Sequence, residues 1–342
     1  MTLLSGTSWL PEHTDPAPHA PFVRTAVHGA ALDALLAASH DQPGLALVGG
    51  DTGTGKTALA DALATRLAAD PAFATGAVTD VAATRSDLRL LRAILASLDS
   101  LDRPAPVPNP IGAIGRSGLD LLTELRARVT AQVAVNRRTV LLLDNAQVLT
   151  GSQLEIVRSL LGRPAAPGES SMSAAGDAPR TDTAPTVVLF ATPELRDRVA
   201  RRRGLASRLI GSATLPPLDR DDLRTLLDGR AATGAPPFSP AALDGLLSLS
   251  HGIPGRALPL AAAAQDEALA RGWEQVDERV IDAILASEPA LNAPDRAATA
   301  ATQAPLPFGE VSPAATPQRT PRAQRPLFGE APPALAGEEG DA

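Results

Sequence analysis

The sequence predicts an α/β fold, with a parallel sheet covered by helices on both faces and a small all-helical region after it. Three continuous apolar runs, Leu45–Gly49, Thr139–Asp144 and Thr186–Ala191, are typical of strands buried in a parallel sheet. Segments with helical spacing of apolar residues alternate with these runs, as they do when crossover helices connect parallel strands. From Asp219 onward the strand pattern stops and only helical segments follow.

Shorter patterns indicate the remaining elements. Apolar residues recur at helical spacing between the strands and in the final region. Helices are expected at His28–His40, Thr57–Ala69, Asp87–Leu98, Gly118–Val135, Ser152–Leu161, Asp219–Leu227, Pro240–Leu249, Pro254–Ala270 and Asp277–Ala286. A further strand is expected near Ala77–Val81.

The composition allows an apolar core and excludes several kinds of chemistry. Of the 342 residues, 44% are hydrophobic but only 2% are aromatic, so aliphatic side chains must form the core. The absence of Cys excludes disulfides and thiolate catalysis, and the five His lack the spacing of a metal site. The net charge of -7 gives no general attraction to nucleic acid. Without a membrane-length apolar run or a leader pattern, we expect a cytoplasmic protein with no membrane contact.

A glycine-rich segment between the first strand and the next helix matches the pattern G-x-x-x-x-G-K-T. It consists of Gly50, Asp51, Thr52, Gly53, Thr54, Gly55, Lys56 and Thr57. In such a P-loop, or Walker A motif, backbone amides surround phosphate oxygens and the positive end of the following helix points at them. Lys56, the only lysine in the sequence, is expected to reach the β- and γ-phosphates of ATP, and Thr57 to bind Mg²⁺.

The apolar run Val140–Asp144 is a candidate Walker B strand, because it delivers a carboxylate about ninety residues after the P-loop. Asp144 is therefore expected to contribute to the Mg²⁺ site together with Thr57. The next residue is Asn145, where ATPases of this type usually have Glu to polarise the attacking water. An amide orients water but does not accept its proton, so we expect hydrolysis to be slow.

Three further sites have two or more interpretations. Thr192 follows the strand Thr186–Ala191, where it would touch the γ-phosphate or the lytic water, or cap the helix beginning at Pro193. A dense basic cluster includes Arg196, Arg198, Arg201, Arg202, Arg203 and Arg208. It is a solvated surface, a source of an arginine finger, or a patch for the phosphates of duplex DNA. Arg256 opens a helix and faces either the nucleotide phosphates or solvent.

Together these pieces resemble the AAA+ ATPases, in particular the bacterial branch of the ExeA secretion ATPase and the transposition ATPases TniB, TnsC and Mu B. The segments that carry the resemblance are GDTGTGKT, VLLLDNAQ, ATPELRDRVARRRGLASRLIGSATLPPLDRDDL and SHGIPGRAL, within about residues 21–288. The resemblance implies that Thr192 is sensor one, Arg208 the arginine finger and Arg256 sensor two. The family pattern is GIPR, whereas Gly255 precedes Arg256 here.

The resulting expectation is a P-loop NTPase of the AAA+ type with a helical lid. We expect a flexible N-terminal arm at 1–20, a nucleotide-binding domain at 21–218, a lid at 219–288 and a disordered Pro/Ala-rich tail at 289–342. Within the second of these, residues 162–185 are expected to be a disordered insertion. The ATP and Mg²⁺ site would lie between domain and lid, completed by a neighbour in a homo-oligomer.

The favoured role is a nucleotide-gated switch on DNA, similar to the ATPases that select transposition targets. ExeA-type proteins add a transmembrane segment and Orc/Cdc6-type initiators add a winged helix, neither of which the polar tail is expected to provide. The alternatives are a slowly hydrolysing protein adaptor and an ExeA-like secretion ATPase. Two similar tail segments, Gln303–Phe308 and Gln324–Phe328, resemble peptides that dock on the sliding clamp, and predict a protein partner of that kind or a transposase-like one.

Overall fold

The computed structural model describes residues 22–99, 117–162, 183–231 and 234–287. Backbone contacts divide the chain into Met1–Leu291 and Asn292–Ala342, and every described residue belongs to the first unit. The predicted N-terminal arm, most of the predicted insertion and the tail with its two repeated segments lie outside the described residues.

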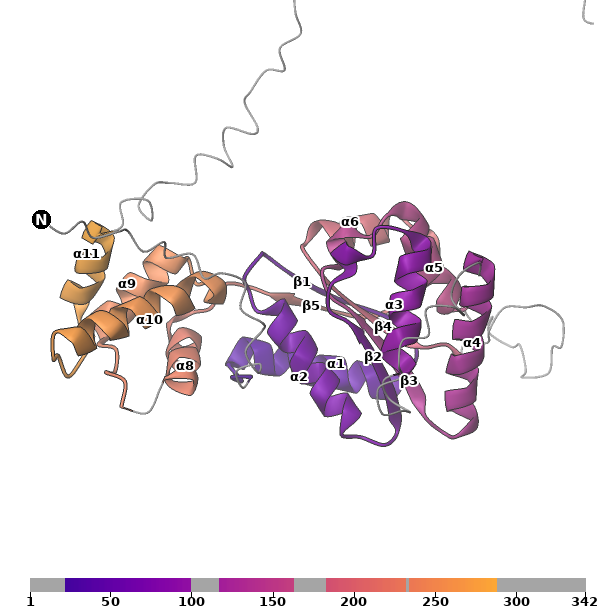
Figure 1. The fold of residues 1–342 in the computed structure, drawn as a ribbon, viewed down its shortest axis with the longest axis horizontal. Helices are drawn as coiled ribbons and strands as arrows, with labels where there is room; N and C mark the ends of the chain where they lie inside the picture. Colours follow the sequence, from indigo (N-terminus) through magenta and orange to yellow (C-terminus); the bar gives the residue numbers. More distant parts are fainter. Residues whose placement is uncertain (1–21, 100–116, 163–182, 232–233, 288–342) are drawn as a thin grey trace, which may run out of the picture. The chain divides into compact units, whose positions relative to one another are not determined.

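The centre of the fold is a five-stranded sheet in which all neighbouring strands are parallel (Figure 1). The strands are β1 (Leu45–Gly50), β2 (Phe73–Val78), β3 (Arg138–Leu143), β4 (Thr186–Ala191) and β5 (Leu209–Leu215). Their order across the sheet is β2-β3-β4-β1-β5, which places β1 and its following loop beside β4. The predicted α/β class is therefore confirmed.

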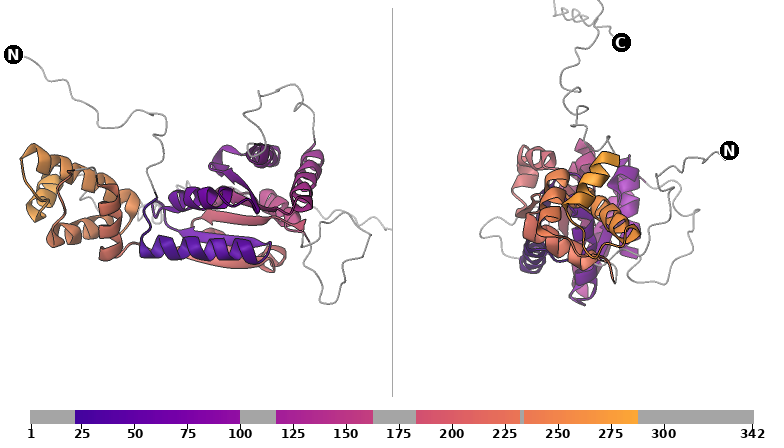
Figure 2. Two further views of the ribbon diagram at one scale, coloured as in Figure 1. Left: turned by 90° about the horizontal axis from the view of Figure 1, so that it is seen from below. Right: turned by 90° about the vertical axis from the view of Figure 1, so that its left-hand side faces the viewer.

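Helices cover both faces of the sheet (Figure 2). The helices and helical turns of this part are α1 (Ala26–Asp41), α2 (Lys56–Ala68), η1 (Val81–Ala83), α3 (Asp87–Asp99), α4 (Gly118–Ala134), η2 (Ala146–Val148), α5 (Gly151–Leu160), α6 (Glu194–Ala200) and α7 (Arg203–Ala206). Along β3, Val140 and Leu142 pack with α1 and α2, whereas Leu141 and Leu143 pack with α3, α4 and α5. This alternation explains why the strands read as continuous apolar runs, because both faces are buried.

Two strands differ from the sequence prediction. The strand expected near Ala77–Val81 is β2, which begins four residues earlier, at Phe73, and ends at Val78. The side chain of Asp80 accepts a hydrogen bond from the amide of Ala82 and starts the turn η1, which ends the strand before Val81. The other difference is β5, which was not predicted. It pairs only with β1, and six of its seven residues are exposed or half-buried, so its sequence LIGSATL lacks a continuous apolar run.

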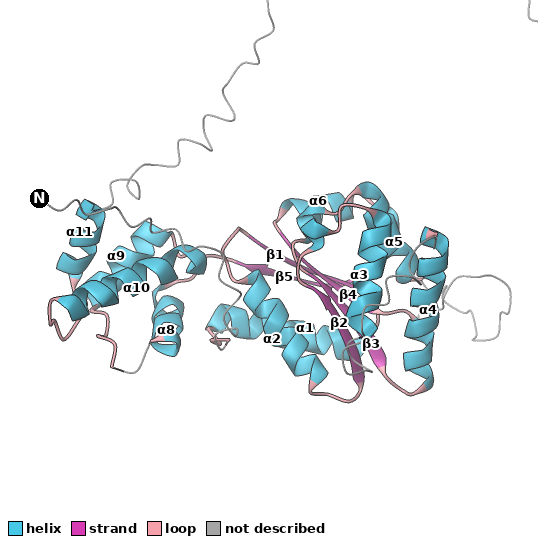
Figure 3. Ribbon diagram, in the orientation of Figure 1, coloured by secondary structure: helices cyan, strands magenta, loops and turns pink. Residues whose placement is uncertain are grey.

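The described chain after β5 is helical apart from one isolated bridge between Phe238 and Val276 (Figure 3). Its helices are α8 (Arg220–Arg230), α9 (Pro240–Ser250), α10 (Pro254–Ala270) and α11 (Glu278–Ser287). They share an apolar cluster of their own that includes Leu223, Leu243, Ala257, Ala261 and Val280. None of the helices in the described residues has the length and apolar character to cross a membrane.

Helix α8 is also attached to the beginning of α1. The buried carboxylate of Asp222 accepts hydrogen bonds from the amides of Ala26 (2.6 Å) and Val27 (3.3 Å). These amides belong to the first turn of α1, where no intrahelical acceptor is available and the helix dipole favours a negative charge. The two parts of the fold therefore meet at a specific polar contact.

Candidate functional site

The P-loop links β1 to α2 and has a backbone that requires glycine. Gly53 and Gly55 have φ angles of 86° and 93°, a region in which residues with a side chain are strained. A Cβ atom at Gly50 would lie 2.6 Å from the hydroxyl oxygen of Thr54. That hydroxyl donates a hydrogen bond to the carbonyl of Asp51 (2.8 Å), which closes the loop on itself.

His28 of α1 contacts this loop through its side chain, a role that no pattern in the sequence predicts. Its Nε2 lies 2.9 Å from the carbonyl oxygen of Thr54, and its Nδ1 lies 2.9 Å from the hydroxyl of Thr25. Because a carbonyl only accepts, Nε2 donates and Nδ1 is left to accept in the neutral ring. A Cβ at Gly55 would lie 2.6 Å from Nε2, so His28 occupies the space that this glycine leaves. No local pattern signals this contact, which joins residues 26 positions apart.

The side chain of Lys56 is buried, with 8% of its surface exposed, and turns back onto the loop. Its Nζ donates hydrogen bonds of 2.7 Å to the carbonyls of both Gly50 and Asp51. Burial lowers the pKa of Lys56, and the negative charges of Asp144 and Asp51 oppose this shift. The ammonium is therefore desolvated at the place where a phosphate would compensate its charge.

Thr57 and Asp144 meet at the carboxyl edge of the sheet. The Thr57 hydroxyl donates a 2.6 Å hydrogen bond to Oδ2 of Asp144, and Oδ1 accepts from the amide of Asn145 (2.8 Å). In the described residues, no group of three or more His, Asp or Glu side chains is arranged to hold a metal. The Thr57 hydroxyl and the Asp144 carboxylate nevertheless fit Mg²⁺, because this ion uses few protein ligands and keeps water and phosphate oxygens around it.

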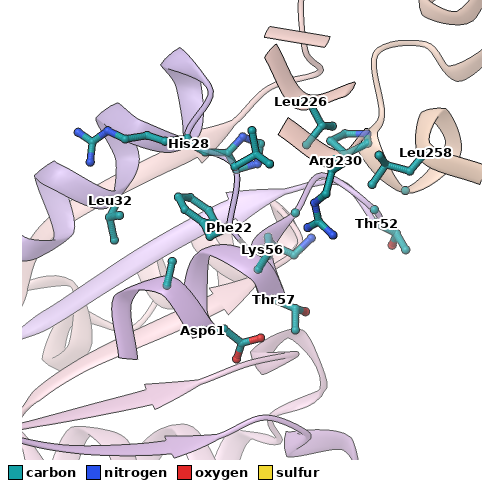
Figure 4. Close-up of a pocket in the computed structure, with 18 of the residues that line it drawn as sticks. Phe22, His28, Leu32, Thr52, Lys56, Thr57, Asp61, Leu226, Arg230 and Leu258 are labelled. Atoms are coloured by element: carbon teal, nitrogen blue, oxygen red, sulfur yellow. The ribbon is translucent and has the colours of Figure 1, made fainter. Parts of the chain in front are cut away.

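A cavity of about 900 Å³ opens beside the P-loop, within the range of roughly 300–1,000 Å³ typical of small-molecule sites (Figure 4). Its walls include the predicted site residues Thr52, Gly53, Gly55, Lys56, Thr57, Asn145 and Thr192. The segment before α1 contributes Phe22 and Arg24, and the helical region contributes Leu226, Arg230, Pro254, Gly255 and Leu258. The cavity thus combines residues from both parts of the fold.

Asn145 and Thr192 lie at the ends of β3 and β4, on the same cavity. Asn145 has a left-handed backbone with φ of 56°, which asparagine tolerates better than most residues. Its side-chain oxygen accepts a 3.4 Å hydrogen bond from Gln147. The side chain of Thr192 is hydrogen-bonded to Glu194, and this bond lowers the pKa of that carboxyl. Thr192 therefore contacts the first turn of α6 while it lines the cavity.

Arg256 and Arg208 lie outside the cavity lining. Arg256 is exposed, and its neighbour Gly255 faces the P-loop, donating a 2.9 Å hydrogen bond from its amide to the carbonyl of Gly53. Arg208 donates to the carbonyls of Gly162 (2.7 Å from Nε) and Gly204, and burial lowers its pKa.

The backbone of Arg208 lies at the far end of the sheet from the P-loop. Its carbonyl accepts a 2.8 Å hydrogen bond from the amide of Leu45, where β1 begins. The P-loop follows the other end of β1, five residues further, which is about 16 Å at the rise of a strand. Arg208 therefore cannot serve the site of its own chain in this arrangement.

The rest of the basic cluster divides into structural and exposed arginines. Arg198 donates to the carbonyls of Gln147 (2.7 Å) and Leu149, and Arg202 pairs with Glu155 (3.2 Å). The side chains of three members are exposed: Arg196, Arg201 and Arg203. Only part of the cluster is thus available to an external partner.

Comparison with known proteins agrees with this geometry. A family model described as an AAA ATPase domain matches residues 22–172, which contain the P-loop and Asp144. General secretion pathway protein A of Aeromonas hydrophila is 30% identical over 257 residues, which are 73% of this chain and 41% of that protein. The chain thus spans about two fifths of the length of this relative.

The fold is also similar to that of two solved structures. The Aeropyrum pernix Orc1 protein in complex with DNA has a TM-score of 0.53 and 19% identity, covering 84% of this chain and 71% of that one. Cdc6p of Pyrobaculum aerophilum has a TM-score of 0.53 and 15% identity, covering 76% and 66%. At these identities the likeness concerns the fold, which is that of the P-loop AAA+ ATPases.

Proposed function

We propose that this protein is an ATP-binding AAA+ ATPase that works as a nucleotide-gated oligomeric switch. The observation that carries the proposal is that Lys56 and Thr57 line a cavity of nucleotide size, with Asp144 hydrogen-bonded to Thr57. Lys56 would hold the β- and γ-phosphates, and Thr57 and Asp144 would hold Mg²⁺, which would neutralise phosphate charge. The loop residues Gly50 to Gly55 would supply backbone amides to the phosphate oxygens.

We propose further that hydrolysis is slow. Asn145 would orient the attacking water, but its amide would not accept the proton that the water must lose. Thr192, on the neighbouring strand end, would place the same water or the γ-phosphate. A slow hydrolytic step keeps a protein in its ATP-bound state for longer, which suits a switch better than a motor.

The oligomeric part of the proposal rests on Arg208. This arginine is remote from the P-loop of its own chain, so any contact with ATP must involve a neighbouring copy. A guanidinium supplied by a neighbour would link assembly to the nucleotide state, because the site is complete only in the oligomer.

Duplex DNA is the favoured partner, as for the transposition ATPases that the sequence resembles. The exposed side chains of Arg196, Arg201 and Arg203 support this role, since phosphate contacts need solvent-accessible cations. The alternatives are a protein adaptor, in which the tail segments at Gln303–Phe308 and Gln324–Phe328 bind a sliding clamp or transposase-like protein, and an ExeA-like secretion ATPase. The slow hydrolysis expected from Asn145 favours the adaptor, and the likeness to general secretion pathway protein A favours the secretion ATPase.

The test is retention of the full chain on duplex DNA with a non-hydrolysable ATP analogue. Binding should require the analogue, be lost in Lys56→Ala and decline with salt by roughly one unit of log-log slope per phosphate contact. The triple substitution of Arg196, Arg201 and Arg203 by Gln should reduce this slope, while Arg224→Gln on α8 serves as an exposed control. Nucleotide binding without any DNA retention would reject the DNA switch and favour the adaptor.

A further inference from the structure

We infer that Arg230, rather than Arg256, is the arginine through which the helical region contacts the phosphates of the bound nucleotide. The inference rests on the proposed binding of ATP at this site. It assigns to the last residue of α8 a role that the sequence resemblance gave to the beginning of α10.

The packing of α10 explains why Arg256 does not reach the site. Gly255 lies directly on the P-loop, and a Cβ atom there would lie 3.0 Å from Cα of Gly53. Gly255 and Leu258, three residues later, line the cavity and define the face that α10 turns toward it. Arg256 is about 100° further round the helix and is exposed.

Helix α8, in contrast, is fixed so that its last residue faces the cavity. Its buried Asp222 holds the amides at the beginning of α1, as described above. Near its other end, a Cβ at Gly229 would lie 2.8 Å from the methyl groups of Val23, so the helix backbone packs tightly against the segment before α1. Arg230 extends from this anchored end into the cavity, toward the side on which Lys56 lies (Figure 4).

The guanidinium of Arg230 contains a donor that lacks an acceptor. Its Nε is buried and has no hydrogen-bond partner among the described residues. A buried donor without an acceptor is unfavourable, and an arginine provides several donors in a fork that matches two phosphate oxygens.

The charges around the cavity identify the kind of ligand. Four basic side chains line it, Arg24, Lys56, Arg66 and Arg230, against the single carboxylate of Asp61. Arg24 is paired with Asp33, whereas Lys56 is buried and donates its hydrogen bonds to two neutral carbonyls of the loop, with the carboxylates of Asp144 and Asp51 nearby. A polyphosphate placed between Lys56 and Arg230 would compensate both cations and join the α/β part to the helical region.

The experiment compares arginine substitutions in the full chain by equilibrium binding of fluorescent ATP, with unlabelled ATP and GTP as competitors. Arg230→Ala should weaken ATP binding about tenfold or more, as expected for a charge-assisted contact, and Arg230→Lys should retain part of the affinity. Arg256→Ala should remain within about twofold of wild type, as should Arg224→Ala, which is exposed on the same helix. The ratio of ATP to GTP affinity should not change in Arg230→Ala, because both ligands carry the same phosphates.

Each other result rejects a defined part of the inference. A large loss in Arg256→Ala with none in Arg230→Ala would overturn it, and a changed ratio of ATP to GTP would put Arg230 on the base instead of the phosphates. Thermal unfolding without nucleotide checks that the variants are folded, and Arg230→Gln replaces Arg230→Ala if the shorter side chain disturbs α8. Absence of Lys56-dependent binding in the wild type would instead reject the proposed ATP site itself, before any arginine is compared.

Discussion

The hydroxyl of Thr57 donates a 2.6 Å hydrogen bond to the carboxylate of Asp144, although 87 residues separate them in the sequence. The sheet order explains the contact, because β3 and β1 are parallel and separated only by β4, so their carboxyl ends reach the same edge. Two oxygen groups are thereby presented together where Mg²⁺ is expected.

Replacing Asp144 by Asn should separate metal binding from nucleotide binding. The amide keeps the shape of the side chain but loses the negative charge, so more Mg²⁺ should be needed to support hydrolysis. The measurement is ATP hydrolysis across a Mg²⁺ titration, with ATP binding in chelator as the control. An unchanged Mg²⁺ requirement would show that Asp144 does not contribute to the metal site.

Lys56 should be labelled selectively by amine-directed reagents, because it is the only lysine in the sequence. Burial lowers the pKa of Lys56, so a larger fraction of its amine is unprotonated at a given pH than for an exposed lysine. As the pH is increased, labelling of Lys56 should therefore begin at a lower pH than labelling of an exposed lysine would. Bound ATP should suppress the reaction by covering the amine and by favouring its charged form. Mass spectrometry across a pH series, with the α-amino group as internal reference, measures both effects. Labelling that saturating ATP does not alter would count against the whole site.

Asn145→Asp should accelerate ATP hydrolysis by supplying a carboxylate next to Asp144. General-base assistance is typically worth ~10²–10⁴, although a shorter and differently placed group should give less. Asp tolerates the left-handed backbone at φ of 56°, whereas Glu would add strain of about 1–2 kcal/mol. Single-turnover hydrolysis of Asn145→Asp and Asn145→Glu, together with their thermal stability, distinguishes chemistry from strain. Rapid hydrolysis by the wild type with no gain in either variant would identify another base.

Mixing Arg208→Ala with Lys56→Ala should restore part of the ATPase activity that each variant lacks alone. A mixed interface can pair an intact Lys56 on one copy with an intact Arg208 on the next, so some sites are complete. Activity is measured against the mixing ratio at a protein concentration where oligomers form. Arg208→Lys is the matched variant, because it keeps the charge but loses the planar fork. If no mixture exceeds its parents, Arg208 serves only its own chain, through the carbonyls of Gly162 and Gly204.

The sequence was sufficient for the parts of the site that lie next to one another in the chain. The P-loop joins a buried strand to a helix, and Asp144 directly follows another buried strand. Short stretches of sequence are therefore enough to predict both the P-loop and the position of Asp144. β5 was missed because an edge strand with one paired side needs no continuous apolar run. His28 and Arg230 were missed because their places depend on how α1 and α8 pack, which no spacing in the sequence encodes.

The carboxylate of Asp222, which caps the start of α1, limits how far the chain can be shortened. A fragment ending at Leu218 would keep every residue of the P-loop and of the sheet. It would nevertheless lose the acceptor for the amides of Ala26 and Val27, at the start of the helix that carries His28. The N-terminus of α1 would then fray, and His28 would no longer be held against the P-loop. We expect such a fragment to bind nucleotide poorly although its P-loop sequence is unchanged.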